Sequence, residues 1–150
     1  MIHFFPSNDV LFLKFVEELH LLDNKSIIPA WTSDQWKELS LRDDYHICLL
    51  YEAEKVGAFA LCGLEDNQIH LYKIAVAHNA RRKGHGHKVF NHVIESFNSK
   101  GLEIESCYLE VRESNKGALN FYESIGFELI HLAKSYYSDG GNACKMLLTF

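Results

Sequence analysis

The chain has 150 residues, of which 47% are hydrophobic and 23% charged, and its formal net charge is −5. This length and apolar content predict one domain spanning residues 1–150 with its own hydrophobic core, and they exclude a disordered tail. The acidic balance, with basic residues concentrated in one stretch, excludes the general positive surface of a nucleic-acid-binding protein. No apolar run approaches the length of a membrane span, so neither nucleic acid nor membrane is an expected partner.

The cysteines and the N-terminus indicate a reducing compartment. No Cys-x-x-Cys pair occurs, and three of the four cysteines lie in apolar, strand-like runs; the four are Cys48, Cys62, Cys107 and Cys144. This usage predicts reduced thiols in the core rather than disulfides or a zinc site. The opening MIHFFPSNDV lacks the charged start and long apolar core of a signal peptide, so we expect a cytoplasmic protein.

The first half of the chain predicts a strand, two helices and an antiparallel meander. Residues 2–5 form a short strand, and Ser7 is the expected N-cap of a helix through SNDVLFLKFVEELHLL. Apolar residues follow roughly helical spacing in this helix at Val10, Phe12, Leu13, Val16 and Leu19. A shorter helix, TSDQWKELS, contains Trp36, which we expect in the core together with Trp31. The strands YHICLLYE, KVGAFALCGL and QIHLYKIAVA follow, joined by tight turns.

The second half predicts alternating helices and strands. A helix over residues 84–100 precedes the strand EIESCYLEVRE, and a helix over residues 115–124, closed by Gly126, precedes the strands FELIHLAKSYY and NACKMLLTF. A strand, a crossover helix and a second strand create a parallel pair. The fold class is therefore mixed α/β (α+β).

The stretch NARRKGHGHKVFNHVIESF places positive charge and two glycines at a helix start. Backbone N–H groups are unpaired there, the helix dipole is positive, and Gly84 and Gly86 allow a ligand to approach the backbone. Side chains that add positive charge are Arg81, Arg82, Lys83, His85 and His87. These features predict a cradle for phosphates, and the alternative is a solvated basic helix start with glycines for turn geometry. The stretch is neither a Walker loop nor the dinucleotide fingerprint, whose third glycine is replaced by Val89.

Three motifs in order carry a resemblance to a known family. ARRKGHG resembles the Arg/Gln-x-x-Gly-x-Gly/Ala loop of the GNAT acetyltransferases, which holds the pyrophosphate of acetyl-coenzyme A. LYKIAVA resembles the family's bulged strand, and LEVRESNKGALNFYESIGF its second half. YLEVRESN, Tyr122 and YYSDGGNACKM are similar to the RimI-like branch, which acetylates the N-terminal alanine of a ribosomal protein. The resemblance covers about residues 68–146, roughly half of the chain, and it departs from the branch at His78 and Arg81.

The resemblance implies the GNAT fold, a mostly antiparallel sheet of about six or seven strands with one parallel pair and about four flanking helices. It implies acetyl-coenzyme A as co-substrate and no metal, with the backbone N–H of Val76 as oxyanion donor. Residues that the resemblance assigns to the coenzyme are Ile74, Val76, Arg81, Arg82, Lys83, Gly84, His85, Gly86, His87 and Asn115. Asn115 is also the expected cap of the helix that follows it.

Acetyl transfer to an amine needs a base for the amine and a proton donor for the leaving thiolate. Glu110 lies on the polar face of its strand with Tyr108 and Arg112, and the resemblance makes it the general base, acting directly or through a water. The alternative is a solvent-facing glutamate paired to Arg112 or Lys73. Tyr122 has a phenol with a reference pKa of ~10, and the resemblance aims it at the coenzyme sulfur. The alternative for Tyr122 is packing in the core.

The acceptor is the least determined part of this prediction, because the N-terminal half resembles the family least. The expected acceptor is the N-terminal α-amine of a protein or peptide, and the alternatives are a lysine side chain or a small-molecule amine. A non-catalytic acetyl-coenzyme A sensor is the alternative from another class. His85-x-His87 has no third ligand at metal-binding spacing. Tyr136 and Tyr137 line the acceptor pocket or are ordinary strand aromatics, and the sequence does not predict an oligomeric state.

Overall fold

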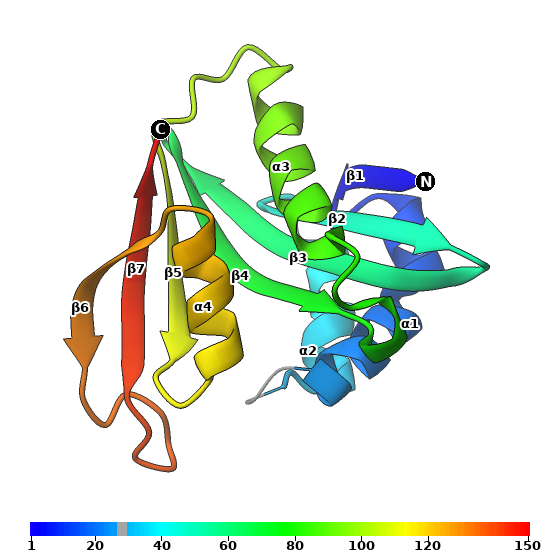
Figure 1. Ribbon diagram of the computed structural model, residues 1–150. Coiled ribbons are helices and arrows are strands. Elements are labelled where there is room, and N and C mark those ends of the chain that lie inside the picture. Colours follow the sequence, from blue (N-terminus) through cyan, green and yellow to red (C-terminus); the bar gives the residue numbers. More distant parts are fainter. Residues whose placement is uncertain (27–29) are drawn as a thin grey trace.

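The computed structural model describes residues 1–26 and 30–150. Seven strands form one sheet in the order β1-β2-β3-β4-β5-β7-β6 (Figure 1). The strands are β1 (Ile2–Pro6), β2 (Tyr45–Glu52), β3 (Lys55–Glu65), β4 (Gln68–Val76), β5 (Ser106–Arg112), β6 (Glu128–Ala133) and β7 (Ala143–Thr149). Only β4 and β5 pair in parallel among these strands. The predicted mixed fold with one parallel pair is therefore confirmed.

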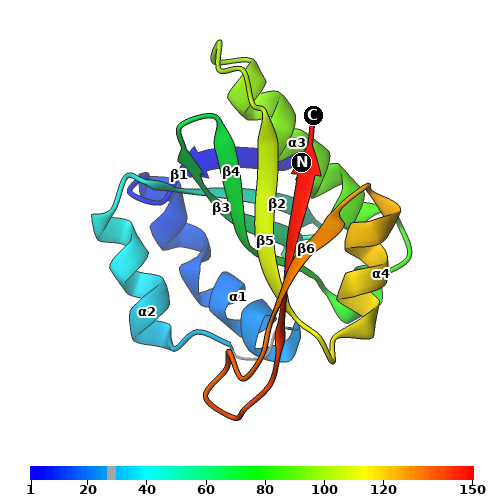
Figure 2. The same ribbon diagram turned by 90° about the vertical axis from the view of Figure 1, so that its left-hand side faces the viewer.

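Helices cover both faces of the sheet (Figure 2). The α-helices of the described residues are α1 (Val10–Ser26), α2 (Ser33–Glu38), α3 (His85–Asn98) and α4 (Lys116–Ser124), and short 3₁₀ turns lie at Leu39–Leu41 and His78–Ala80. Helices α1 and α2 bury one core on their face, with Phe12 and Trp36 against Phe59. Helices α3 and α4 bury a second core on the opposite face, with Phe97 and Tyr122 among its members. None of the described helices is long and apolar enough to span a membrane.

The start of α1 differs from the prediction. The side chain that caps the helix is Asp9, whose carboxylate accepts a hydrogen bond from the backbone N–H of Leu11 at 2.9 Å. Ser7 instead donates its hydroxyl to the carbonyl of Arg42 at 2.7 Å. The predicted N-cap at Ser7 is therefore wrong, because Ser7 lies in the turn that follows β1 and its hydroxyl is used in a tertiary contact.

The buried stripe of α1 also differs from the predicted one. Val10 is 81% exposed and Leu13 is 61% exposed, so neither belongs to the core. The residues of α1 that are buried in the core are Phe12, Phe15, Val16, Leu19 and Leu22. Their spacing follows one face of a helix, whereas Val10 and Leu13 lie off that face. All four cysteines are buried free thiols, as predicted, and Trp36 is buried, whereas Trp31 is only half-buried.

Strands β4 and β5 share only a short seam. Their parallel pairing joins residues 68–71 to residues 106–109. Beyond this seam β4 continues beside β3, and β5 continues beside β7, so the two strands diverge (Figure 1). The divergence leaves a gap between β4 and β5 in the middle of the sheet.

A bulge in β4 changes which way its side chains face. Leu61 of β3 pairs with Lys73, and the next residue, Cys62, pairs with Leu71, so Tyr72 is the extra residue. Leu71 belongs to the core beneath α3 and α4, whereas Ala75 belongs to the core beneath α1 and α2. The bulge predicted for LYKIAVA is therefore present, and it turns the second half of β4 toward α1.

Candidate active site

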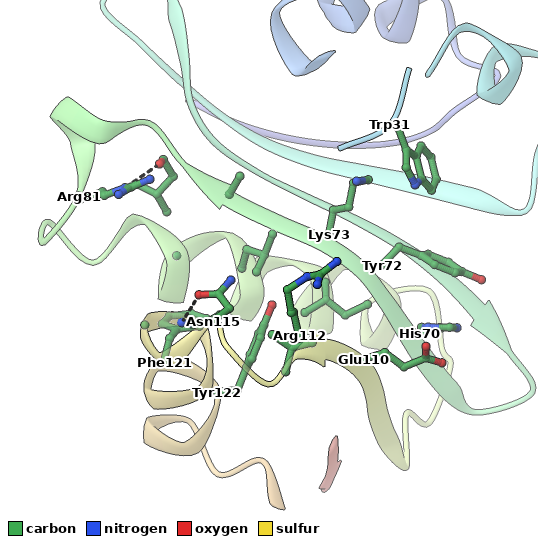
Figure 3. Close-up of a pocket in the computed structure, with 18 of the residues that line it drawn as sticks. Trp31, His70, Tyr72, Lys73, Arg81, Glu110, Arg112, Asn115, Phe121 and Tyr122 are labelled. Atoms are coloured by element: carbon green, nitrogen blue, oxygen red, sulfur yellow. Dashed lines mark hydrogen bonds between the residues drawn. The ribbon is translucent and has the colours of Figure 1, made fainter. Parts of the chain in front are cut away.

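A cavity of about 860 Å³ occupies the gap between the diverging strands (Figure 3). Its walls are residues 70–76 of β4, residues 110–112 of β5 and the first turns of α4, with Trp31, Tyr136 and Tyr137 at one end. A smaller hollow of about 330 Å³ shares Gly86 and Val76 with it and is lined by the loop that leads into α3. The cavity thus connects the predicted phosphate cradle to the two predicted catalytic residues.

The loop before α3 approaches the cavity without bulky side chains. Gly84 is the N-cap of α3 and has a φ of 76°, in the left-handed region that favours glycine. A Cβ placed on Gly86 would lie 3.1 Å from two ring carbons of Phe121, so a side chain there would require the Phe121 ring to shift. The free N–H groups of the first turn of α3 and its dipole can therefore face an anion at close range.

The five predicted cationic side chains of this loop do not share one role. Arg81 and Arg82 are exposed and line both hollows, and Arg81 also donates its Nε–H to the carbonyl of Val76 at 3.2 Å. Lys83 is exposed and lines neither hollow, so the structure does not bring it to the site. The ring of His85 is buried, with Nε2 3.4 Å from the carboxylate of Glu52, and the residue also lines the smaller hollow.

The remaining residues predicted at the coenzyme end line the cavity or the loop. The ring of His87 packs against Phe121 at 5.0 Å between centroids. Ile74 and Val76 form part of the β4 wall. The side chain of Asn115 accepts a hydrogen bond from the backbone N–H of Ala118 at 3.1 Å, which confirms its predicted role as the cap of α4, and it also lines the cavity.

Glu110 is hydrogen-bonded by phenols and lies opposite Lys145 of β7 in the sheet. Its Oε1 accepts a hydrogen bond from the hydroxyl of Tyr108 at 2.8 Å. A hydrogen bond with Glu110, together with burial, raises the pKa of Tyr136 to about 12. The alternative ion pairs of Glu110 are not formed, since Lys73 binds Asp23 and Arg112 binds Asp139, both at 2.9 Å. The carboxylate of Glu110 therefore faces the cavity with its charge uncompensated by these two cations.

Tyr122 has its ring in the core and also lines the cavity. Its ring is 7% exposed and packs edge-on against Phe121 and Phe127. Its hydroxyl points into the cavity (Figure 3). Burial raises the pKa of this phenol, so it keeps its proton through the neutral range. A ring in the core and a protonated hydroxyl in the cavity are what a general acid requires.

The sequence missed most of the end of the cavity that lies away from the loop. Trp31 was expected in the core but lines the cavity, whereas Trp36 is fully buried as expected. Lys73 lines the cavity too and is held by Asp23 of α1. No sequence pattern predicts contacts between residues so far apart in the chain. Because of the bulge in β4, regular alternation also gives the wrong face of the strand for Lys73. The described residues contain no group of three or more side chains that could hold a metal ion.

Comparisons with known proteins agree with this geometry. The model of the acetyltransferase (GNAT) family matches residues 13–127. The ribosomal protein bS18-alanine N-acetyltransferase of Salmonella typhimurium is 27% identical over 129 residues, which are 79% of this chain and 86% of that protein. N-alpha-acetyltransferase 50 of Danio rerio is 40% identical over 118 residues, 76% of this chain and 70% of that protein.

The fold also has solved counterparts. The crystal structure of the ribosomal-protein-S18-alanine N-acetyltransferase from Escherichia coli superposes with a TM-score of 0.81 at 24% identity, covering 99% of this chain and 94% of that one. In sequence, further bacterial enzymes of this kind align over 55% to 58% of their length.

Proposed function

The chain belongs to the acetyltransferase (GNAT) family and is an acetyl-coenzyme A-dependent N-acetyltransferase, and we propose that its acceptor is the N-terminal α-amine of a protein or peptide. The observation that carries the proposal is the single cavity that joins the loop before α3 to Glu110 and Tyr122. Two relatives whose names state N-terminal acetylation support the α-amine as acceptor, and a ribosomal protein is a candidate substrate.

We assign the loop end of the cavity to the coenzyme. The backbone N–H groups at Gly84–Gly86 and the side chains of Arg81 and Arg82 would hold the pyrophosphate, because unpaired donors and positive charge meet there. The open edge of β4 at Ile74–Val76 would run beside the pantetheine arm. Gly84 and Gly86 line the smaller hollow without side chains, so the residues present fit a ligand that presses against the backbone.

We assign the proton transfers to Glu110 and Tyr122. An amine is mostly protonated at neutral pH, so Glu110 takes its proton, directly or through a water, and frees the nitrogen lone pair. The nitrogen then forms a bond to the thioester carbonyl carbon, and the carbon–sulfur bond breaks with its electron pair on sulfur. Tyr122 gives its phenolic proton to that sulfur, and the second proton that the nitrogen must lose to become a neutral amide restores the phenol, so the free thiol and the acetylated amine are released with one proton left on Glu110. The backbone N–H of Val76 is our candidate for stabilising the developing oxyanion.

A peptide competition tests the acceptor. One peptide carries a free α-amine on a small residue followed by basic residues, a second has the same sequence with a blocked N-terminus, and spermidine is a third acceptor. Because the carboxylate of Glu110 lines this end of the cavity and is not paired to Lys73 or Arg112, we expect the cationic first peptide to be acetylated on its α-amine. Mass spectrometry that places acetyl groups only on lysine ε-amines or on spermidine would overturn the proposed acceptor.

Binding without turnover would instead indicate a sensor. If the protein binds acetyl-coenzyme A but acetylates none of these acceptors, the catalytic roles of Glu110 and Tyr122 are wrong. A cytoplasmic location is part of the proposal, and the four free, buried thiols are consistent with a reducing compartment.

A further inference from the structure

A buried ion pair borders the end of the cavity where Trp31 lies. The ammonium of Lys73 is 2.9 Å from Oδ1 of Asp23, and the two side chains are 4% and 0% exposed. Removing two charges from water is costly, and a buried pair often stabilises a fold no better than apolar residues would. The proton transfers assigned to Glu110 and Tyr122 do not use this pair. Its presence beside the site therefore calls for another role.

The carboxylate of Asp23 accepts three hydrogen bonds from two other segments. Its Oδ1 accepts from Lys73 of β4, whereas its Oδ2 accepts from the backbone N–H of Trp31 at 2.9 Å and from the indole N–H of Trp36 at 2.8 Å. Asp23 itself belongs to α1. One fully buried residue thus fixes α1, β4 and the start of the segment around α2 to one another.

The same pair sets the position of the Trp31 ring. The ammonium of Lys73 lies 4.8 Å from the centroid of that ring, within the range of a cation–π contact. Trp31 is therefore held at its backbone by Asp23 and at its ring by Lys73. Figure 3 shows Trp31 and Lys73 on the side of the cavity across from Glu110 and Arg112. The bulge at Tyr72 is what turns Lys73 toward Trp31 and α1.

We propose that Asp23 and Lys73 are positioning residues that hold Trp31 as a wall of the acceptor-binding end of the cavity. The inference rests on the proposed function, because it assigns that end to the acceptor peptide. Pairing with Asp23 also keeps the ammonium of Lys73 from binding Glu110. Loss of the pair should loosen Trp31 and weaken acceptor binding, while the coenzyme end stays as it is.

Steady-state kinetics of Lys73→Met give the first test. Methionine keeps most of the side-chain length and removes the charge. We expect the KM for the acceptor peptide to rise by about 10-fold or more, the kcat to change by less than about 3-fold, and the Kd for coenzyme A to change by less than about 2-fold. Lys37→Met, on the exposed side of α2, is the matched control and should change none of these. An unchanged KM in a folded Lys73→Met variant would overturn the proposal.

A double-mutant cycle and the variant Trp31→Ala distinguish an effect on the position of Trp31 from a general loss of stability. If the pair acts as a unit, Asp23→Asn and Lys73→Met together should raise KM by less than the product of the single effects. Trp31→Ala leaves both charges in place and should raise the peptide KM by a similar factor. If Trp31→Ala binds the peptide as the wild type does, Trp31 is no wall of the acceptor end and the proposal is wrong.

Tryptophan fluorescence tests the positioning without any turnover. The chain has two tryptophans, Trp31 and Trp36, and both hydrogen-bond to Asp23. In a Trp36→Phe background only Trp31 emits, and adding Lys73→Met should shift its emission to the red and raise acrylamide quenching at least about 2-fold. This readout holds even if no peptide is ever acetylated, so failure of the proposed function is distinguishable. Unchanged quenching would show that Lys73 does not hold Trp31.

Discussion

The two ends of the cavity are built in opposite ways. The loop end consists of backbone from the consecutive residues 81–87. Gly86 has no side chain, and a Cβ there would crowd the ring of Phe121. The other end consists of side chains from β4, β5 and the connection between β6 and β7, together with Trp31, which precedes α2. A ligand common to a whole family can be held by backbone, whereas a ligand that differs between proteins must be recognised by side chains.

The two ends of the cavity also differ in whether their cationic side chains are paired with carboxylates. At the loop end, Arg81 and Arg82 have no carboxylate partner within salt-bridge distance among the residues that the structure describes. At the other end, Lys73 is paired with Asp23, and Arg112 is paired with Asp139. The loop end thus keeps free positive charge for phosphates. At the other end, the carboxylate of Glu110 lines the cavity and is paired with neither Lys73 nor Arg112.

The largest expected effect is the loss of kcat on substitution of Glu110. Glu110→Gln keeps size and strand geometry but cannot accept a proton. It should lower kcat by about 10²- to 10⁴-fold near neutral pH, the usual contribution of a general base. The loss should shrink at high pH, where the amine deprotonates unaided, and the Kd for coenzyme A should not change. Glu128→Gln on the exposed edge strand β6 is the control, and equal kcat values for the two variants would refute the role of Glu110.

A change at Gly86 should affect only the loop end. Gly86→Val adds branched atoms where even a Cβ would be 3.1 Å from the ring of Phe121. The Kd for coenzyme A, measured by titration calorimetry, should rise by about 100-fold, and the rise in Tm on adding acetyl-coenzyme A should disappear. Gly57→Ala is the matched control, because its Cβ would make only ordinary contacts of 3.5 Å. Wild-type affinity in Gly86→Val would place the coenzyme elsewhere.

Tyr122→Phe should separate the chemistry from both binding ends. The variant keeps the ring packing and removes only the hydroxyl, so we expect kcat to fall on the order of 10²-fold with little change in the Kd for the coenzyme. Because burial raises the pKa of this phenol, the wild type should lose no activity through ionisation of Tyr122 up to about pH 10. Tyr51→Phe, where the ring packs against Phe15, is the control. An unchanged kcat would make Tyr122 a core residue only.

The smallest effect should be confined to the acceptor end. Arg112 donates to both carboxylate oxygens of Asp139, at 3.0 and 2.9 Å, and lies 4.1 Å from the ring centroid of Tyr137. Asp139→Asn should loosen the loop that carries Tyr136 and Tyr137 and raise the peptide KM about 2- to 5-fold, because an exposed ion pair contributes little. The Kd for coenzyme A should stay the same. A change in that Kd would mean that the two ends are coupled.

The fold and the loop end could be predicted because their signals are local. Alternating apolar residues mark the strands, and two glycines after a cationic run mark the start of α3. Glu110 could be predicted because β5 alternates regularly, so its position within the strand determines which face it occupies. The cap of α1 was mispredicted because Ser7 and Asp9 are both good caps, and only a tertiary contact to Arg42 occupies Ser7.

The acceptor end could not be predicted, since its contacts are not local. Asp23 and Lys73 are fifty positions apart, and neither lies in a motif. Strict alternation would place Lys73 on the same face as Ile69 and Leu71, toward α3. The bulge at Tyr72 shifts the second half of β4 by one residue and reverses that face.

The short seam between β4 and β5 also has a mechanical consequence. Four residue pairs in parallel register are all that join the half-sheet β1–β4 to the half-sheet β5–β7 through strand pairing. Beyond this seam the facing backbone edges of the two strands form no hydrogen-bonded ladder. The two half-sheets are therefore joined by strand pairing at one end and separate at the other. A molecule bound between β4 and β5 would contact both half-sheets at once. Occupancy of the gap should therefore stiffen the molecule as a whole, well beyond the residues that it touches.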